Sequence, residues 1–272
     1  MAARFPQSGT SVAYRIANAY SSKIKALYWA ASADSVHRLY SSDTSTTILT
    51  RATSGAGFNA TDGLITGDVN GSGGVYFSDS VSGGFGVTEA GPFVYGYGFF
   101  GDLFNGASAD FWVMGAVAPM DAFRNKAAIY VAGSGDNMPV SGQSPSTSLG
   151  GLSDDVAAWE TRAFRYDSGD GVATSRGWRN GAEVTGFRTS PTASASNTIG
   201  DASNALRFGG SESGTGNTNL HPDCWWVASG LTDAELNAIT ADPSVMIEVS
   251  GGAVGGLAGG KLNNGILFGR LK

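Results

Sequence analysis

The sequence predicts an all-β protein built as a two-sheet antiparallel sandwich. Its 41 glycines and its charged fraction of 15% fit many short strands joined by tight turns, and they leave little room for long helices. Strand-like runs follow one another at short spacing from residue 75 onward. One of them, ADFWVMGAVAP at 109–119, is apolar at both alternating sets of positions, which is typical of a central strand covered on both faces.

The other strands are indicated by alternation and by turn residues. Asn180-Gly181 predicts a hairpin turn within 172–187, because both residues tolerate the positive φ that a type I′ turn demands. The run 24–40 fits either short strands or one irregular helix, and its periodicity does not decide between them. Further runs with the composition of strands lie at 44–50, 75–81, 92–104, 126–133 and 157–169.

One short helix is predicted near the end of the chain. Thr232 and Glu235 have the spacing of a capping box, in which each side chain bonds a backbone amide of the first helical turn. Pro243 forbids continuation of the helix. The apolar side of this helix is supplied by Leu231, Leu236 and Ile239.

The single cysteine and the first residues limit the classes of protein to which this chain can belong. Cys224 excludes an intramolecular disulfide, and its place beside Trp225 and Trp226 predicts a buried, inert thiol. The first residues lack the apolar core of a secretory signal, and no stretch approaches the roughly 20 apolar residues that span a bilayer. We therefore expect a product of the cytoplasm with no membrane insertion.

The net charge of −6 is unevenly distributed. Residues 1–51 carry six basic against two acidic residues, residues 52–250 carry eight against 21, and residues 251–272 carry three basic residues and no acid. The basic ends favour docking on an acidic protein surface, although solvation alone also accounts for exposed charges. Nucleic acid is not the expected partner, because no stripe of Lys and Arg with interleaved aromatic residues is present.

Three motifs together resemble a known superfamily. FWVMGAV at 111–117, GWRNGAEV at 177–184 and the segment 205–241, with its last strand and capped helix, occur in this order over roughly 60–243. In that order they resemble the laminin-G-like domains of the concanavalin A-like lectin/glucanase superfamily. The resemblance implies a jelly-roll sandwich with one short C-terminal helix. Glucanases of this superfamily carry two glutamates flanking an aspartate on one strand. This chain has no such motif, so we expect that it is not an enzyme.

The predicted organisation is an N-terminal extension at 1–54, the sandwich at 55–245, and a glycine-rich C-terminal arm at 246–272. Eight of the last 22 residues are glycine, which gives a segment with a high entropic cost of ordering. We expect the arm to be held by neighbouring subunits, the alternative being that it packs on its own domain. Its anchoring residues would be Leu262, Ile266, Leu267, Phe268, Arg270 and Leu271.

Two kinds of ligand site are candidates. Aromatic rings stack on the C–H faces of sugars, and the rings that could do so are Trp159, Trp178, Tyr95 and Tyr97, the alternative for each being packing within the sandwich. Asp68, Asn70, Ser72 and Asp79 stand at positions 1, 3, 5 and 12 of an EF-hand-like loop. Calcium is therefore the one cofactor to consider, against a plain turn between strands.

This architecture, with arms and without a catalytic motif, resembles the lectin-fold appendage proteins of tailed bacteriophages. The resemblance implies a virion structural protein, either a capsid decoration protein or a tail-associated subunit. It would be a homo-oligomer on the virion surface, assembled in the host cytoplasm, with other virion proteins and host glycans as partners. The alternatives are a free carbohydrate-binding lectin module and a glycan hydrolase on the same fold.

Overall fold

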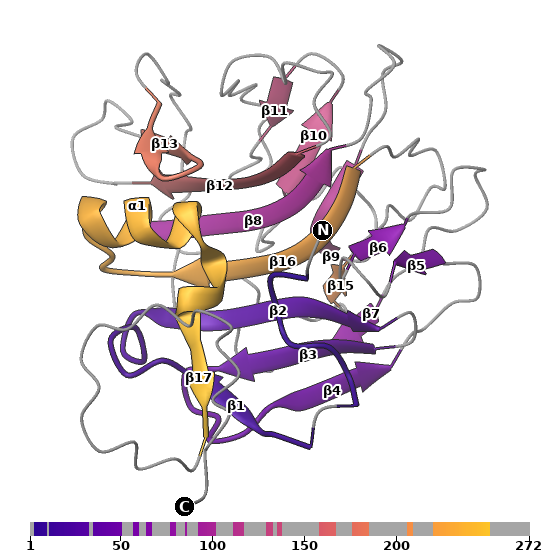
Figure 1. The fold of residues 1–272 in the computed structure, drawn as a ribbon. Helices are drawn as coiled ribbons and strands as arrows, with labels where there is room; N and C mark the ends of the chain where they lie inside the picture. Colours follow the sequence, from indigo (N-terminus) through magenta and orange to yellow (C-terminus); the bar gives the residue numbers. More distant parts are fainter. Residues whose placement is uncertain are drawn as a thin grey trace, which may run out of the picture.

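The computed structural model describes the protein in segments, drawn in colour in Figure 1. For strands of the smaller sheet it describes the backbone alone. The described residues are 3–9, 11–32, 35–50, 57–59, 64–66, 77–79, 85, 92–101, 111–116, 129–132, 135–137, 158–166, 176–184, 206–208 and 220–250.

The larger sheet has eight antiparallel strands, and it is the layer that carries the described side chains. Across the sheet the order is β14 (Ala182–Glu183), β13 (Arg176–Arg179), β12 (Ala158–Tyr166), β8 (Phe93–Gly101), β16 (Leu220–Ala228), β2 (Ile24–Ser32), β3 (Ser35–Tyr40) and β4 (Thr47–Thr50).

The smaller sheet lies behind the larger one in Figure 1 and has five antiparallel strands. Two further pairs stand apart, β1 (Tyr14–Ile16) with β17 (Ile247–Val249) and β5 (Gly57–Asn59) with β6 (Leu64–Thr66). These sheets confirm the predicted fold class, an all-β antiparallel sandwich. The smaller sheet runs in the order β11 (Gly135–Asn137), β10 (Ile129–Ala132), β9 (Phe111–Ala116), β15 (Leu206–Phe208) and β7 (Phe77–Asp79).

The sequence runs that were expected to form strands do so where the structure describes them. The run at 109–119 forms β9, which has β10 and β15 on its two sides and is therefore a central strand, as predicted. The undecided run at 24–40 forms the hairpin of β2 and β3. Asn180 has a φ of 47° and Gly181 a φ of 89°, which confirms the predicted hairpin turn between β13 and β14.

The larger sheet is buried on both faces. Toward the smaller sheet, the ring of Tyr97 stacks on those of Phe99 and Phe164 at centroid distances of 5.7 and 6.2 Å. On the other face the core combines strand residues with side chains from the C-terminal helices and from residues 3–9. Its buried members there include Trp29, Trp178, Trp226, Phe5, Leu236, Ile239 and Met246.

The predicted helix is α1 (Asp233–Ala241), and its capping box is confirmed. The Thr232 hydroxyl accepts the Glu235 backbone N–H, and the Glu235 carboxylate accepts the Thr232 backbone N–H at 2.8 Å. Leu231 is buried with the inward side of α1. Pro243 opens a 3₁₀ helix, η1 (Pro243–Met246), instead of continuing α1. Among the described residues no helix has the length and apolar character needed to span a membrane.

The structure divides the chain differently from the predicted organisation. Strands β2, β3 and β4 lie within 1–54, yet β2 pairs with β16 along the centre of the larger sheet, so this part belongs to the sandwich. The reason is that the buried run of β2 supplies a core strand, which an extension would expose. At the other end, Met246 is buried and β17 pairs with β1, so the sandwich continues to residue 250. Residues 251–272, with the expected anchoring residues of the arm, lie outside the described residues.

Candidate functional site

The four rings predicted as a sugar platform have different surroundings. Trp178 and Tyr97 have no exposed surface, so their ring faces are covered. Both side chains pack within the sandwich, which was the alternative to sugar binding. The side chain of Tyr95 lies outside the described residues. Trp159, on β12, is half-buried and is the described candidate that retains accessible surface. The functional site is therefore built around Trp159.

A guanidinium from the beginning of the chain lies on the Trp159 ring. Residues 3–9, which we call the N-terminal strap, cross the face of the larger sheet. The Arg4 guanidinium carbon stands 4.3 Å from the centroid of the Trp159 ring, a cation–π distance. The same group donates from Nη1 to the Thr161 hydroxyl at 2.6 Å. Thr161 follows Trp159 by two positions on β12, so both side chains leave the strand on the same face.

A buried carboxylate completes this arrangement. Arg4 donates from Nε to Asp223 Oδ2 and from Nη2 to Asp223 Oδ1, both at 2.7 Å. The Asp223 side chain is 2% exposed and the Arg4 side chain 14% exposed. Burial alone lowers the pKa of Arg4, but the Asp223 carboxylate outweighs it and holds that pKa above its ordinary value. The Arg4 guanidinium is therefore positively charged at every physiological pH.

Gly98 on β8 forms the floor of this arrangement. A Cβ at position 98 would stand 2.2 Å from Arg4 Nη2 and 2.5 Å from Asp223 Oδ1, distances that real side chains do not adopt. Only glycine lets the ion pair lie this close to the strand. We call the space bounded by Trp159, Thr161 and Asp223, with Gly98 beneath, the Arg4 recess.

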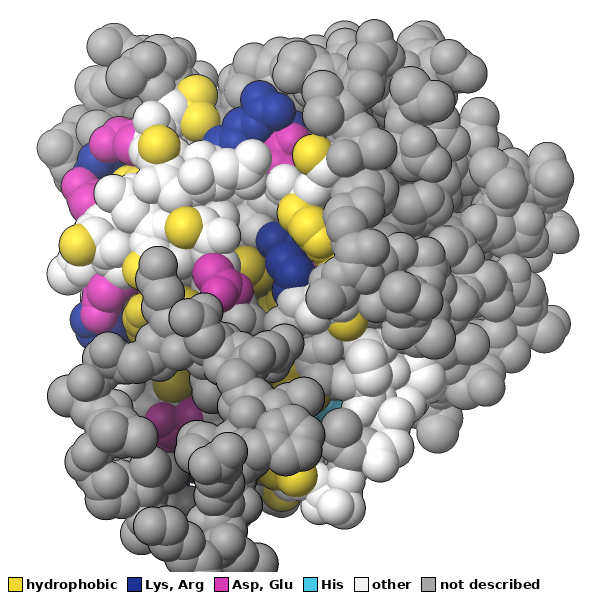
Figure 2. All heavy atoms as spheres, in the orientation of Figure 1, with side chains coloured by type: hydrophobic (Ala, Val, Ile, Leu, Met, Phe, Trp, Pro, Cys, Tyr) yellow, Lys and Arg dark blue, Asp and Glu magenta, His cyan; other side chains and the backbone are white. Residues whose placement is uncertain are grey.

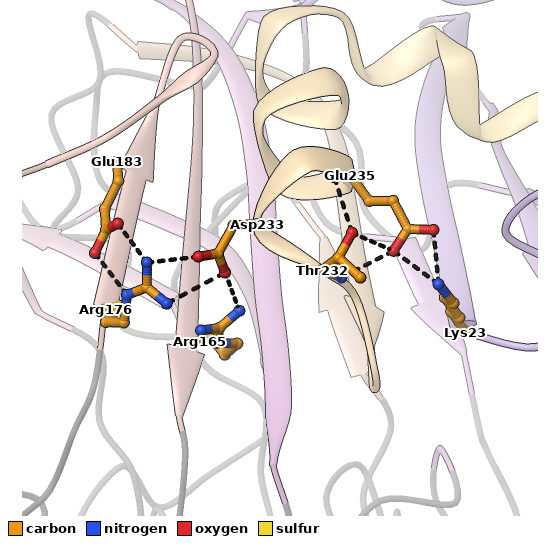
Figure 3. Close-up of polar contacts among 7 residues, drawn as sticks. All are labelled: Lys23, Arg165, Arg176, Glu183, Thr232, Asp233 and Glu235. Carbon is orange, nitrogen blue, oxygen red and sulfur yellow. Dashed lines mark hydrogen bonds and ion pairs between the residues drawn. The ribbon is translucent and has the colours of Figure 1, made fainter.

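Trp178 lies beside a second cluster, whose charged side chains bond α1 to the sheet and are drawn in Figure 3. The guanidinium carbons of Arg165 and Arg176 stand 5.0 and 4.9 Å from the Trp178 ring centroid. Both arginines also bond Asp233, the first residue of α1, and Arg176 pairs with Glu183 in addition. The hydrogen bond from Arg176 is the main cause that lowers the pKa of Asp233 and of Glu183. This cluster uses its charges to position the helix.

The other end of the same helix turn is fastened by an ammonium group (Figure 3). Lys23 donates to both Glu235 oxygens, at 2.6 and 2.7 Å. Burial raises the pKa of Glu235, but Lys23 and the Thr232 cap outweigh it, and the net shift is downward. Figure 2 shows the result on this face: basic and acidic side chains lie next to one another around α1, with apolar atoms between them.

A third cluster lies on the opposite face of β12. Glu160 accepts from Arg162, whose side chain has no exposed surface, and from Arg179 at 2.7 Å. In the described part of the chain, every acidic side chain of these clusters thus faces a cationic group. A general acid requires a raised carboxyl pKa, whereas the resolved carboxyl shifts here are downward.

His37 and Cys224 are two further buried titratable groups among the described residues. His37 is 5% exposed, stands edge-on to Trp29 at 5.1 Å, and has no hydrogen-bond partner at either ring nitrogen within the described residues. Burial lowers its pKa. Cys224 is fully buried, as predicted, and burial followed by the nearby Asp223 charge raises its pKa well above the ordinary value. Neither group is placed as a nucleophile or a base.

The expected calcium loop lies largely beyond what the structure describes. Asp68, Asn70 and Ser72 fall outside the described residues, and Asp79 is described as the last backbone position of β7. Among the described side chains, no three of the types His, Cys, Asp and Glu come together in a way that could hold a metal ion. The calcium site stays a prediction.

The fold places this chain among proteins that are built as antiparallel β-sandwiches. No family model and no curated protein matches it. Among solved structures it is similar to the sialidase of Trypanosoma rangeli in complex with 2,3-difluorosialic acid, with a TM-score of 0.52 and 12% identity over 81% of this chain. It is also similar to the binding domain of botulinum neurotoxin serotype D, with a TM-score of 0.52 and 10% identity over 81% of this chain. The chain covers 33% of the first structure and 51% of the second, and at this identity the likeness establishes the fold.

Sequence reasoning missed three members of the site. Arg4 is one of the six basic residues of 1–51 and Asp223 lies within the segment 205–241, but no sequence pattern marks either as a site residue. Gly98 carried a signal: in FVYGYGFFG the aromatic residues of one face alternate with glycine on the other. A strand face bare of side chains indicates that another group approaches the backbone closely.

Proposed function

We propose that this chain is a non-catalytic, lectin-like subunit of a bacteriophage virion, displayed on the virion surface and binding host glycans. The sandwich would serve as scaffold and recognition domain, and assembly through the chain ends with other virion proteins would give a homo-oligomer. Head or tail attachment is open in this proposal, which covers both a capsid decoration protein and a tail-associated subunit.

The observation that carries the recognition role is the lectin-like sandwich with a half-buried tryptophan beside a carboxylate and a hydroxyl. Trp159 offers a ring face, and Asp223 and Thr161 offer polar atoms next to it. The carboxylates of the clusters described above are engaged by guanidinium or ammonium groups. This engagement supports binding over hydrolysis by the usual pair of carboxyl groups, one ionised and one protonated.

The virion role is supported by the sequence at the C-terminal end. Residues 251–272 combine glycine with three basic residues and apolar side chains, and they follow directly on the last described strand pair. Such a segment gains order by contact with another surface. In this proposal the arm begins after residue 250, since Met246 is buried and β17 pairs with β1.

Two experiments test the proposal. Virions of the encoding phage should contain the protein when they are purified and analysed by mass spectrometry, and a variant ending at residue 250 should be made in the cell yet be absent from the particles. A glycan array that includes neutral, amino and sialylated glycans should show binding by the full chain. Release of reducing sugar from the bound glycans would favour the hydrolase instead, and a chain absent from virions that still binds glycans would be a free lectin.

A further inference from the structure

We infer that the Arg4 recess is a sugar-binding subsite that the protein fills with its own Arg4 side chain in this structure. The inference rests on the proposed glycan-binding function. It adds where the glycan binds, which class of sugar binds, and that the Arg4 side chain competes with the sugar for the same place. The ligand class is a neutral or amino sugar with two adjacent hydroxyl groups. Binding would require the N-terminal strap to leave the face of Trp159.

The first argument is that the groups around Arg4 are those that hold a sugar. Asp223 accepts two parallel N–H bonds from the guanidinium at 2.7 Å each, and the same two oxygens can accept O–H bonds from adjacent hydroxyls of a pyranose. The Trp159 ring, 4.3 Å from the guanidinium carbon, can equally cover the C–H face of a sugar ring. The Thr161 hydroxyl, which accepts from Arg4 Nη1, can donate to or accept from a third sugar oxygen.

The second argument is that the recess is built by the sheet and does not depend on the strap. Asp223 lies on β16, Trp159 and Thr161 lie on β12, and Gly98 lies on β8 between these two strands. The absence of a side chain at Gly98 creates the depth, since a Cβ there would stand 2.8 Å from Cys224 Sγ and closer still to Arg4 and Asp223. Sites held on paired strands keep their geometry when a bound group leaves.

The third argument concerns the way in which the strap is attached. Residues 3–9 form neither helix nor strand. Beyond Arg4, the strap is held by Phe5, whose ring stacks on Trp29 at 5.7 Å, by the Trp29 indole N–H donating to the Pro6 carbonyl, and by a backbone bond from Ser8 to Ala31. Arg4 and Phe5 thus supply the two large side-chain contacts of the strap, as anchor residues do in a short bound peptide.

The charge of Asp223 decides which sugars fit. A sugar carboxylate placed at the position of the guanidinium would face the buried Asp223 carboxylate, and two like charges in a buried site repel strongly. Sialic acid is therefore excluded from this recess, even though a structurally similar sialidase is described with a sialic acid analogue. An amino sugar would instead bring the opposite charge.

The test measures glycan binding by full-length variants on an array of neutral, amino and sialylated glycans, followed by calorimetric titration with the strongest neutral or amino hit. Arg4→Ala should bind at least ~10-fold tighter than the wild type, because the fraction of molecules with an open recess rises. Asp223→Asn should lose at least ~10-fold. Phe5→Ala loosens the strap and keeps both Arg4 and Asp223, so it should also bind the sugar more tightly than the wild type. This variant replaces Arg4→Ala in the test if Arg4→Ala does not fold. Arg15→Ala, which removes an exposed ion pair with Glu248 elsewhere, is the matched control and should bind like the wild type.

The outcomes separate this inference from the proposed function. Wild type, Arg4→Ala, Phe5→Ala and Asp223→Asn binding the same glycan equally would place the sugar site elsewhere, and the inference would fall while the lectin function stood. No binding by any of these proteins would contradict both the inference and the lectin function.

A second readout uses guanidinium as a probe of the recess. Low millimolar guanidinium chloride should raise the thermal midpoint of Arg4→Ala and leave that of the wild type unchanged. It should also compete with the sugar for binding to the variant. A sugar that is not displaced by guanidinium also overturns the assignment to this recess.

Discussion

Arg4 and Asp223 are separated by 219 positions in the chain and form a bidentate ion pair at the centre of one sheet face. The pair joins the first described segment of the protein to β16, the strand at the middle of the larger sheet. Both side chains are mostly withdrawn from solvent. Because a buried ion pair that loses one partner leaves an uncompensated charge, this contact fixes the N-terminal strap more firmly than surface ion pairs do elsewhere in the protein.

The first prediction compares two arginines. Arg4→Ala should lower the free energy of unfolding by about 3–5 kcal/mol, the usual cost of breaking a buried pair. Arg15→Ala should lower it by less than about 1 kcal/mol, because its pair with Glu248 is more than a third exposed on both sides and is screened by solvent. Urea unfolding followed by tryptophan fluorescence measures both. Equal losses for the two variants would mean that the recess does not hold its ion pair as described.

Two glycines on β8 lead to the second prediction. A Cβ at Gly96 would lie 1.9 Å from the Trp226 ring, and one at Gly98 would lie 2.2 Å from Arg4 Nη2. Gly96→Ala and Gly98→Ala should each destabilise by about 1–3 kcal/mol, because an overpacked core forces neighbours out of place. The two variants should respond differently to a second substitution. Adding Arg4→Ala should recover part of the stability lost by Gly98→Ala and none of the stability lost by Gly96→Ala. A double-mutant cycle from urea unfolding gives both coupling energies, and a coupling of zero at position 98 would contradict the geometry.

Much of the fold could be predicted because its signals are local. The capping box at Thr232 and Glu235 and the turn at Asn180-Gly181 are fixed by hydrogen bonds and φ values within a few residues, and both were confirmed. The place of residues 24–50 could not be predicted in the same way. Whether such a segment is an extension or part of the main sheet depends on β2 pairing with β16, nearly 200 positions away, and no periodicity within β2 encodes that partner.

The sequence allowed one residue of the candidate site, Trp159, to be predicted, but not the residues that surround it. Trp159 was a candidate because an aromatic residue on a strand can bind a sugar, but Trp178 and Tyr97 had the same pattern and are buried. Their difference arises from what covers the sheet: Arg165 of β12 and Arg176 of β13 lie over the ring of Trp178, and rings of β8 and β12 lie against that of Tyr97. Arg4 and Asp223 meet only because the strap crosses the sheet, a relationship that depends on the complete fold.

The third prediction concerns the start of α1. Thr232→Ala should cost about 1 kcal/mol, because the backbone N–H of Glu235 loses its acceptor, while Thr232→Ser keeps a hydroxyl and should cost much less. Glu235→Gln should weaken both the cap and the contact with Lys23. The free energies of unfolding of these variants in urea provide the comparison. A serine variant as unstable as the alanine variant would show that the hydroxyl bond does not stabilise the helix.

The fourth prediction uses the cysteine as a probe. Because burial and the Asp223 charge raise the pKa of Cys224, almost no thiolate forms in the native protein, and the thiol should not react with a disulfide reagent at mildly alkaline pH. It should react at once in urea. In Arg4→Ala the reaction in native buffer should become faster, since the strap that helps to cover this part of the sheet is loosened. Fast reaction of the folded wild type would show that β16 is more accessible than the structure indicates.

The last prediction concerns acid stability. The folded-state pKa of His37 lies below its ordinary value of 6.5 because the ring is buried with both nitrogens unbonded among the described residues. A histidine with a depressed folded-state pKa binds more protons when unfolded, so the free energy of unfolding should fall as the pH decreases from 6.5 toward the folded-state pKa. His37→Leu keeps an apolar side chain of similar size beside Trp29 and removes the titration, so its stability should change less between about pH 5 and pH 7. The carboxylates of Glu183, Asp233 and Glu235, whose pKa values are lowered, act in the same direction only at lower pH, where both proteins should lose stability alike. Urea unfolding at a series of pH values measures the two curves, and parallel curves across this interval would show that His37 does not titrate with unfolding.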